Sequence, residues 1–134
     1  MQFIARVEQL HDILQWIQEQ LKPMGLSRET LRHVELAAEE VFVNIVRHAY
    51  QGRPEKMEIE VRLFPAYAEV AFFDHGPPFN PLNVERVDPT LPLEKREVGG
   101  LGIHLIRKCV SDLRYERLGK QNVLTLIIRS SQKR

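Results

Sequence analysis

The chain has 134 residues, of which 43% are hydrophobic and 28% charged, and its formal net charge at pH 7 is +1. This length supports one domain with a hydrophobic core, and the near-neutral charge argues against a strongly basic nucleic-acid-binding protein or a polybasic membrane anchor. We do not expect a signal peptide in the opening residues, and no apolar run approaches the ~18 residues of a membrane span. The single cysteine, Cys109, excludes an intrachain disulfide and is expected in the core. We expect one cytoplasmic domain over residues 1–134, without direct contact to nucleic acid or membrane.

The first part of the chain is expected to form a short strand and two helices. Residues 3–7 alternate weakly, which predicts a strand, whereas residues 8–24 carry apolar side chains at helical spacing and end in a Pro-Met-Gly sequence. Ser27 is a suitable N-cap for the next helix. We expect that helix to run to about Tyr50.

A hairpin and an irregular segment follow. Residues 57–63 alternate between apolar and charged side chains and predict a half-buried strand, and residues 67–73 predict its antiparallel partner, ending at Asp74. The sequence HGPPFNP then prevents regular structure because of its prolines and glycine. Residues 82–98 have no clean period and predict a mobile loop.

The last part of the chain predicts a helix at about 101–110 and a hairpin with strands at 113–118 and 123–129, turning at Gly119. The complete order favours an α+β fold, a two-layer sandwich in which a mostly antiparallel sheet carries helices on one face. A doubly wound parallel sheet is disfavoured because few β-α-β crossovers are present.

Three polar residues share one side of the second predicted helix. Glu40, Asn44 and His48 follow one another at intervals of four residues and flank the apolar stripe. Carboxylate and amide oxygens suit magnesium, which takes few protein oxygens together with water and phosphate. An ordinary exposed Glu–Asn pair has the same spacing, and a lone histidine there is more typical of capping or packing.

Two further stretches carry groups that could recognise a nucleotide. Asp74, at the end of a strand, could accept a hydrogen bond from an amino group such as that of adenine, or it could cap its own loop as an Asx-turn. The glycines of VGGLG, at 98–102, precede a helix and offer backbone N–H groups to phosphate. The spacing matches neither a P-loop nor a Rossmann fingerprint.

Taken together, these stretches carry a resemblance to a known superfamily. EEVFVNIVRHAY, DHGPPFNP and VGGLGIHLIRKC, closed by NVLTLI, resemble the N, G1 and G2 boxes of the Bergerat-fold ATPases. The HAY after the N box and the GPPF sequence look most like the anti-sigma factor serine kinases of bacteria. The resemblance covers nearly the whole chain and implies the same order of elements.

The resemblance assigns roles to the helix residues. Glu40 matches a general base for a serine hydroxyl, and Asn44 matches the magnesium ligand. Glu39 is the competing base, but its spacing is wrong by one residue and it points about 100° around the helix. His48 is grouped with the residues that bind the nucleotide.

The resemblance also assigns the nucleotide contacts. Asp74 matches the residue that binds the adenine amine, supported by Gly76 and by Thr125. Gly100 and Gly102 match the hinge and the phosphate contacts of an ATP lid, with Leu101 between them.

Two features depart from the superfamily pattern. Pro78 occupies the position of the second glycine of the G1 box, which predicts a stiffer loop. The lid between Asn80 and Gly99 is short, and we assign no role to its mixed charges Glu94 to Glu97.

The resemblance implies a protein serine kinase that uses ATP and Mg²⁺. It also implies two partners, a sigma factor and a serine-bearing anti-anti-sigma protein, and a homodimer. A nucleotide-binding partner-switch module without phosphoryl transfer is the alternative function. A third hypothesis is an interaction domain that binds no nucleotide.

Overall fold

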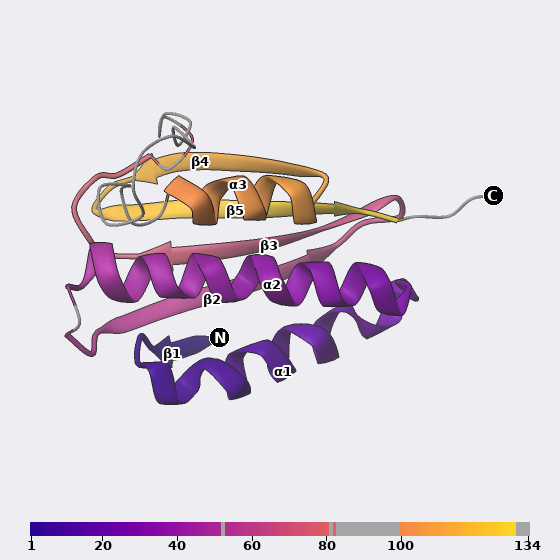
Figure 1. Ribbon diagram of the computed structural model, residues 1–134, viewed down its shortest axis with the longest axis horizontal. Coiled ribbons are helices and arrows are strands. Elements are labelled where there is room, and N and C mark those ends of the chain that lie inside the picture. Colours follow the sequence, from indigo (N-terminus) through magenta and orange to yellow (C-terminus); the bar gives the residue numbers. More distant parts are fainter. Residues whose placement is uncertain (52, 81, 83–99, 131–134) are drawn as a thin grey trace.

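The computed structural model describes residues 1–51, 53–80, 82 and 100–130 (Figure 1). The strands and helices within these residues, in chain order, are β1 (Gln2–Ile4), α1 (Leu10–Leu21), α2 (Arg28–Asn44), β2 (Lys56–Leu63), β3 (Tyr67–Asp74), α3 (Gly100–Cys109), β4 (Asp112–Leu118) and β5 (Gln121–Arg129). Three shorter helical segments are η1 (Val7–Gln9), η2 (Lys22–Met24) and the π-helix η3 (Ile45–Ala49).

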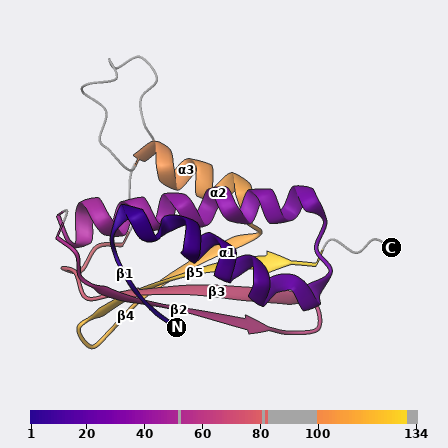
Figure 2. The ribbon, with the colours of Figure 1, turned by 90° about the horizontal axis from the view of Figure 1, so that it is seen from below.

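The strands form one five-stranded sheet in the order β1-β2-β3-β5-β4, and every pairing is antiparallel. All three α-helices lie on one face of this sheet (Figure 2). The expected α+β sandwich is therefore confirmed, and the doubly wound parallel alternative is excluded. The central pairing of β3 with β5 runs from Tyr67 opposite Arg129 to Asp74 opposite Asn122.

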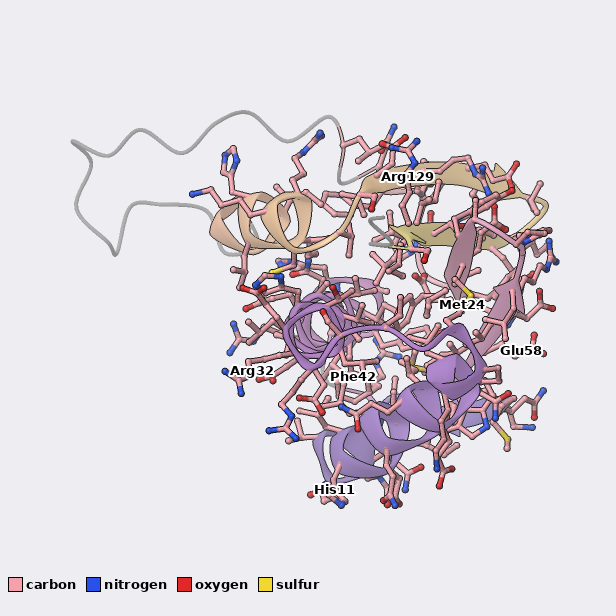
Figure 3. The ribbon with its side chains drawn as sticks, turned by 90° about the vertical axis from the view of Figure 1, so that its right-hand side faces the viewer. His11, Met24, Arg32, Phe42, Glu58 and Arg129 are labelled. Atoms are coloured by element: carbon pink, nitrogen blue, oxygen red, sulfur yellow. The ribbon has the colours of Figure 1, made fainter. Side chains whose placement is uncertain are left out.

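The core lies between the helices and the sheet. Alternate residues of each strand turn toward the helices, and an apolar stripe on each helix meets them, because side chains repeat every second residue in a strand and about every 3.6 residues in a helix. In Figure 3 Phe42 lies inside, whereas Arg32 and Arg129 lie at the surface. The largest fully buried side chains are Phe42, Phe72, Ile13, Ile17, Leu21, Met57, Ile59, Ile103, Ile106, Leu126, Val34 and Val41.

The first two elements are shorter than the sequence predicts. The strand expected at 3–7 is observed at Gln2–Ile4, and the helix expected at 8–24 is α-helical only from Leu10 to Leu21, with a 3₁₀ turn at each end. The Ser27 cap is confirmed, since its side-chain oxygen accepts a hydrogen bond from the Thr30 N–H at 3.0 Å.

The second helix does not continue to Tyr50 as a regular α-helix. Its α-helical part ends at Asn44, and the next residues form the π-helix η3, in which the Tyr50 N–H bonds the Ile45 carbonyl at 3.0 Å. Such π-helical turns occur frequently at functional sites. The α-helix changes to a π-helix immediately after Asn44, the residue that the resemblance assigns to magnesium.

The loop expected at 82–98 lies outside the described residues beyond Leu82. Among the described residues, no helix has both the length and the apolar character needed to span a membrane.

Candidate functional site

A cavity of about 310 Å³ opens between the end of α2, the π-helix η3 and the strands β3, β5 and β4. Its volume lies at the lower end of the range for small-molecule sites, and its walls are largely apolar with a few polar groups, as such sites usually are. The lining residues are Val41, Asn44, Ile45, His48, Ala49, Phe72, Asp74, Pro77, Pro78, Phe79, Tyr115, Asn122 and Leu124.

Three of the residues predicted from the sequence meet at this cavity. Asn44 is the half-buried last residue of α2, His48 is exposed one turn later on η3, and Asp74 is the buried last residue of β3. The fold brings Asp74 to the helix residues because the end of β3 lies beneath the end of α2.

Asp74 holds its carboxylate in a defined way. The residue is 7% exposed, and its Oδ1 accepts hydrogen bonds from the Gly76 N–H at 2.9 Å and from the Asn122 side-chain amide at 2.9 Å. No donor among the described residues bonds to Oδ2. Asp74 thus does cap its own loop, but it uses only one oxygen to do so. The second oxygen keeps its accepting capacity for a ligand.

Gly76 is required by a close approach of two chain segments. A Cβ added at Gly76 would lie 2.5 Å from the Ala49 Cβ and 2.8 Å from the Ala49 Cα. Such distances are far below ordinary carbon–carbon contact. The absence of a side chain therefore lets the loop after Asp74 pack against the end of η3, which closes one side of the cavity.

Asn122 is a cavity-lining residue that the sequence pattern did not predict. It is 5% exposed, lies directly opposite Asp74 in the β3–β5 pairing, and lines the cavity. Its amide also donates to the Pro77 carbonyl at 2.9 Å. The signal available in the sequence was a polar residue directly before the apolar run of the last strand, but the strand was expected to begin only at Val123.

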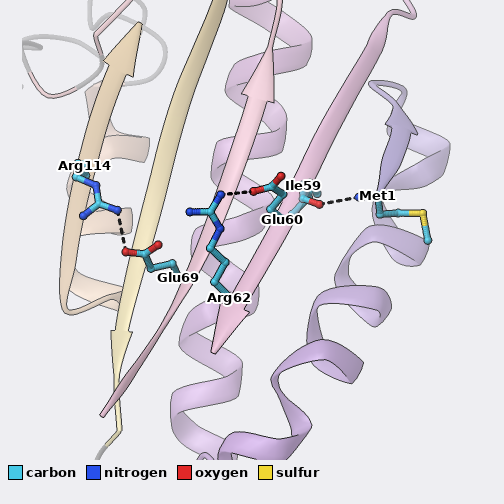
Figure 4. Close-up of polar contacts among 6 residues, drawn as sticks. All are labelled: Met1, Ile59, Glu60, Arg62, Glu69 and Arg114. Atoms are coloured by element: carbon cyan, nitrogen blue, oxygen red, sulfur yellow. Dashed lines mark hydrogen bonds and ion pairs between the residues drawn. The ribbon is translucent and has the colours of Figure 1, made fainter. Parts of the chain in front are cut away.

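Thr125 is not brought to the cavity, contrary to the expectation that it supports the Asp74 site. It is buried in the middle of β5, where it pairs with Ala71 on one side and Arg114 on the other. Successive side chains of a strand point to opposite faces, and Leu124 lines the cavity, so Thr125 lies on the face without helices. Figure 4 shows the neighbouring Arg114–Glu69 ion pair, at 2.8 Å, with the helices behind the sheet.

The two candidate bases differ in burial. Glu40 is half-buried and Glu39 is exposed, in accordance with the different sides of α2 to which they belong. Glu40 lies one helical turn before Asn44 and is not among the cavity-lining residues. It therefore lies beside the cavity rather than in its wall.

The predicted lid glycines begin α3. Gly100, Leu101 and Gly102 form the first turn of this helix, whose start lies at the same end of the molecule as the end of α2 (Figures 1 and 2). Free N–H groups at a helix start attract anions. The side chain of Leu101 and the charges at Glu94 to Glu97 lie outside the described residues.

An aromatic pair flanks the cavity. The rings of His48 and Phe79 stack with centroids 6.1 Å apart and planes inclined by 26°. Phe79 is 47% exposed although it is large and apolar. The pair joins η3 to the loop after β3, and Phe79 is a lining residue that the sequence pattern did not predict.

Tyr50, the last residue of the HAY sequence, connects the end of η3 with β2 and with the loop after β3, and it does not line the cavity. Its hydroxyl donates to the Lys56 carbonyl at 2.7 Å and accepts from the His75 N–H at 2.8 Å. Burial is the main reason that the pKa of the Tyr50 hydroxyl is raised. Burial likewise raises the pKa of the Cys109 thiol, which agrees with packing rather than nucleophilic chemistry.

The metal-ligating potential of the described residues is small. Among them, no group of three or more His, Cys, Asp or Glu side chains could hold an ion. The side-chain oxygen of Asn44 at the cavity wall fits a cation such as magnesium, which takes most of its ligands from water and phosphate.

Fold and site together define a nucleotide-binding domain of the ATPase type. Residues 3–128 match the histidine kinase-like ATPase domain, and the chain belongs to that family. The resemblance carried by the three boxes is thereby confirmed.

Curated relatives of the chain are named protein kinases. The chain is 27% identical over 96 residues to the serine-protein kinase RsbW of Oceanobacillus iheyensis, and this match covers 68% of the chain but only 61% of that protein. It is 27% identical over 114 residues to RsbW of Listeria monocytogenes, covering 81% of the chain and 73% of the relative. The serine/threonine-protein kinase BtrW of Bordetella bronchiseptica is 29% identical over 97 residues, and this match covers 72% of the chain and 68% of the relative.

Solved structures with the same fold include histidine kinases. The Acinetobacter baumannii histidine kinase AdeS matches with a TM-score of 0.56 at 14% identity, over 98% of this chain and 68% of that one. The mycobacterial sensor histidine kinase MprB matches with a TM-score of 0.53 at 16% identity, over 97% of both chains. At these identities the matches concern the fold.

Proposed function

We propose that this domain binds ATP with magnesium in the cavity and transfers the γ-phosphoryl group to a serine of a protein partner. The observation that carries the proposal is the state of Asp74: a buried carboxylate at a mostly apolar cavity, with one oxygen held by two neutral donors and the other without a donor among the described residues.

The adenine ring would be recognised at Asp74. Its exocyclic amine is a donor and matches Oδ2, which can only accept while the carboxylate is ionised. Apolar side chains from both layers, Ile45 on η3 and Leu124 on β5, supply surface for a flat ring. Gly76 would keep the loop close enough to η3 to enclose it.

The phosphates would lie toward Asn44 and the start of α3. The Asn44 side-chain oxygen would hold the magnesium ion, which supplies charge neutralisation to the phosphates when bound. The first-turn N–H groups at Gly100 and Gly102 would bind phosphate oxygens. Positioning and charge neutralisation make up most of phosphoryl-transfer catalysis.

Glu40 would act on the incoming serine. Its carboxylate, one turn from Asn44, would accept the proton of the serine hydroxyl while the hydroxyl oxygen forms its bond to the γ-phosphorus and the bond to the β–γ bridging oxygen breaks. The half-burial of Glu40, compared with the exposure of Glu39, supports this choice of base.

The partners we propose are a sigma factor, which the domain would sequester, and an anti-anti-sigma protein that carries the serine. Support comes from the resemblance of the three boxes and from the relatives named serine-protein kinases. A homodimer is proposed on the same resemblance.

A second function is favoured by one observation, namely that Glu40 does not line the cavity. In that case the domain binds ATP and switches partners without transferring phosphate.

Phosphate transfer from labelled ATP to a serine-bearing partner separates the two functions. We expect Glu40→Gln to abolish transfer while ATP affinity stays unchanged, and the matched control Glu39→Gln to retain transfer. Transfer that persists in Glu40→Gln would remove Glu40 from its role. Tight ATP binding without transfer by the wild type would establish the partner switch instead.

A further inference from the structure

The loop after β3 is fastened to the β4–β5 hairpin mainly by the side chains of Asn122 and Arg117, with a longer contact of 3.5 Å between the Gln121 and His75 side chains. We call residues 74–79 the G1 loop. From the hairpin, Asn122 donates to the Pro77 carbonyl at 2.9 Å and, more weakly, to the Gly76 carbonyl at 3.4 Å, while Arg117 donates to the Gly76 carbonyl at 2.8 Å.

The hydrogen bonds of Asn122 fix which way its amide faces. The Asn122 Oδ1 accepts from the Tyr115 hydroxyl and from the Phe79 N–H, at 3.3 Å for the latter. Since a backbone N–H can only donate, the amide oxygen must lie on that side. The opposite side meets only acceptors, namely the Asp74 Oδ1 and the carbonyls of the G1 loop. A reversed amide would lose partners on both sides.

A fixed amide has a direct effect on Asp74. The Asn122 N–H holds Oδ1 as an acceptor, and the Gly76 N–H holds the same oxygen from within the loop. Two donors on one oxygen set the rotation of the carboxylate. The other oxygen, Oδ2, then remains an acceptor at a defined place.

We propose that Asn122 is a positioning residue that makes the site select bases with an exocyclic amine over bases with a carbonyl at that position. A purine amine donates to the Asp74 Oδ2. A purine carbonyl oxygen would instead face Oδ2, acceptor against acceptor, and the bond from Asn122 prevents the Asp74 carboxylate from rotating to relieve that repulsion. The inference rests on the proposed nucleotide-binding function and goes beyond it, because it assigns base selectivity to a residue of the hairpin.

Arg117 provides the matched control. It anchors the G1 loop through the Gly76 carbonyl, and its described hydrogen bonds do not include Asp74. Loss of Arg117 removes loop anchoring alone, whereas loss of Asn122 removes both loop anchoring and the orientation of the Asp74 carboxylate, so the difference between the two variants isolates the orientation. Arg117→Gln weakens binding of any nucleotide, whereas loss of Asn122 changes the preference among nucleotides.

The test is the ratio of ATP to GTP affinity, measured by calorimetry with magnesium on the folded chain. The variants are Asn122→Leu, which has similar size and no donor, Asn122→Thr, which keeps one O–H donor for Asp74, and Arg117→Gln. We expect the ratio to fall about tenfold or more in Asn122→Leu, because a hydrogen bond to a charged group is lost, and to recover in Asn122→Thr. Arg117→Gln leaves the ratio unchanged.

The outcomes distinguish the inference from the function on which it rests. A wild-type protein that binds neither nucleotide overturns both. ATP preference that is lost in Asp74→Asn but kept in Asn122→Leu overturns the role of Asn122 and leaves the pocket intact. If Asn122→Leu does not fold, Asn122→Thr decides: a ratio that collapses despite the remaining donor overturns the inference.

Discussion

Among the described residues, each face of the sheet carries one buried carboxylate, and the two are held differently. Asp74, on the helix-covered face, is 7% exposed and is bonded by a backbone N–H and a side-chain amide, both neutral. Glu69, on the face without helices, is 8% exposed and pairs with the Arg114 guanidinium at 2.8 Å. The pair also raises the pKa of Arg114, chiefly through the hydrogen bond to Glu69.

The difference shows what a ligand site requires. Arg114 neutralises the charge of Glu69, so that carboxylate is satisfied within the sheet and has no charge to offer. Neutral donors orient Asp74 without cancelling its charge, no donor among the described residues bonds to its Oδ2, and Asp74 lines the cavity. Burial alone therefore does not distinguish the carboxylate that we propose for ligand binding from the one that pairs within the sheet; the charge of its partners does.

The largest expected effect follows from replacing each carboxylate by an amide. In Asp74→Asn the new oxygen takes the bonds from Asn122 and Gly76, and the new NH₂ group faces the adenine amine, donor against donor. We expect the Kd for ATP to rise about 100-fold or more, measured by calorimetry. In Glu69→Gln the Kd should stay unchanged. Equal effects of the two substitutions on the Kd would contradict the different roles that we assign to Asp74 and Glu69.

A second prediction concerns magnesium at the helix-covered face. Mg²⁺-ATP at about 100 times its Kd should stabilise the wild type by roughly 2.7 kcal/mol, seen as a rise in the thermal unfolding midpoint. Asn44→Ala should lose the magnesium-dependent part of that rise. Arg62→Ala, at an exposed ion pair on the open face, should keep all of it. A full rise in Asn44→Ala would remove Asn44 from the metal site.

A third prediction sharpens the role of the G1 loop. Gly76→Ala inserts a methyl group against Ala49 and should lower the free energy of unfolding by about 1–3 kcal/mol, a typical cost of overpacking, and weaken ATP binding. Gly119→Asn is the control, since its position has open space and a left-handed φ of 60° that asparagine tolerates. Urea unfolding compares the two, and an unchanged stability of Gly76→Ala would contradict the close contact.

The smallest effect is expected at the open face. Arg114→Met should reduce stability by about 1 kcal/mol or less, because the Arg114 side chain is 53% exposed and solvent screens the pair. The loss should shrink at high salt, as urea unfolding at two salt concentrations can measure. Nucleotide affinity should not change, and a weaker affinity in this variant would show that the faces are coupled.

The family resemblance, and no local signal, implied that Asp74 meets Asn44 and His48 at one site. The amino-acid sequence by itself determined the order of elements, the antiparallel sheet with helices on one face, the Ser27 cap and the placement of Asn44 and His48 on one side of a helix. These features depend on local signals: apolar periodicity, turn residues and polar residues at helical spacing. Such signals act over a few residues, so they can be interpreted without knowledge of the tertiary contacts.

Tertiary structure alone decided which residue of the last strand supports Asp74. Residues 123–128 are apolar on both faces apart from Thr125, because β5 is a central strand, and so the alternation does not reveal which face carries the cavity. The strand β5 begins at Gln121, two residues before the predicted start at Val123, and pairs with β3. In this register Asn122 lies opposite Asp74, and Thr125 faces away from the cavity. A side chain's face follows from register, and register is set by pairing with a strand that lies far away in the sequence. The π-helix at Ile45–Ala49 and the contact of Gly76 with Ala49 were likewise decided only when the two layers packed together.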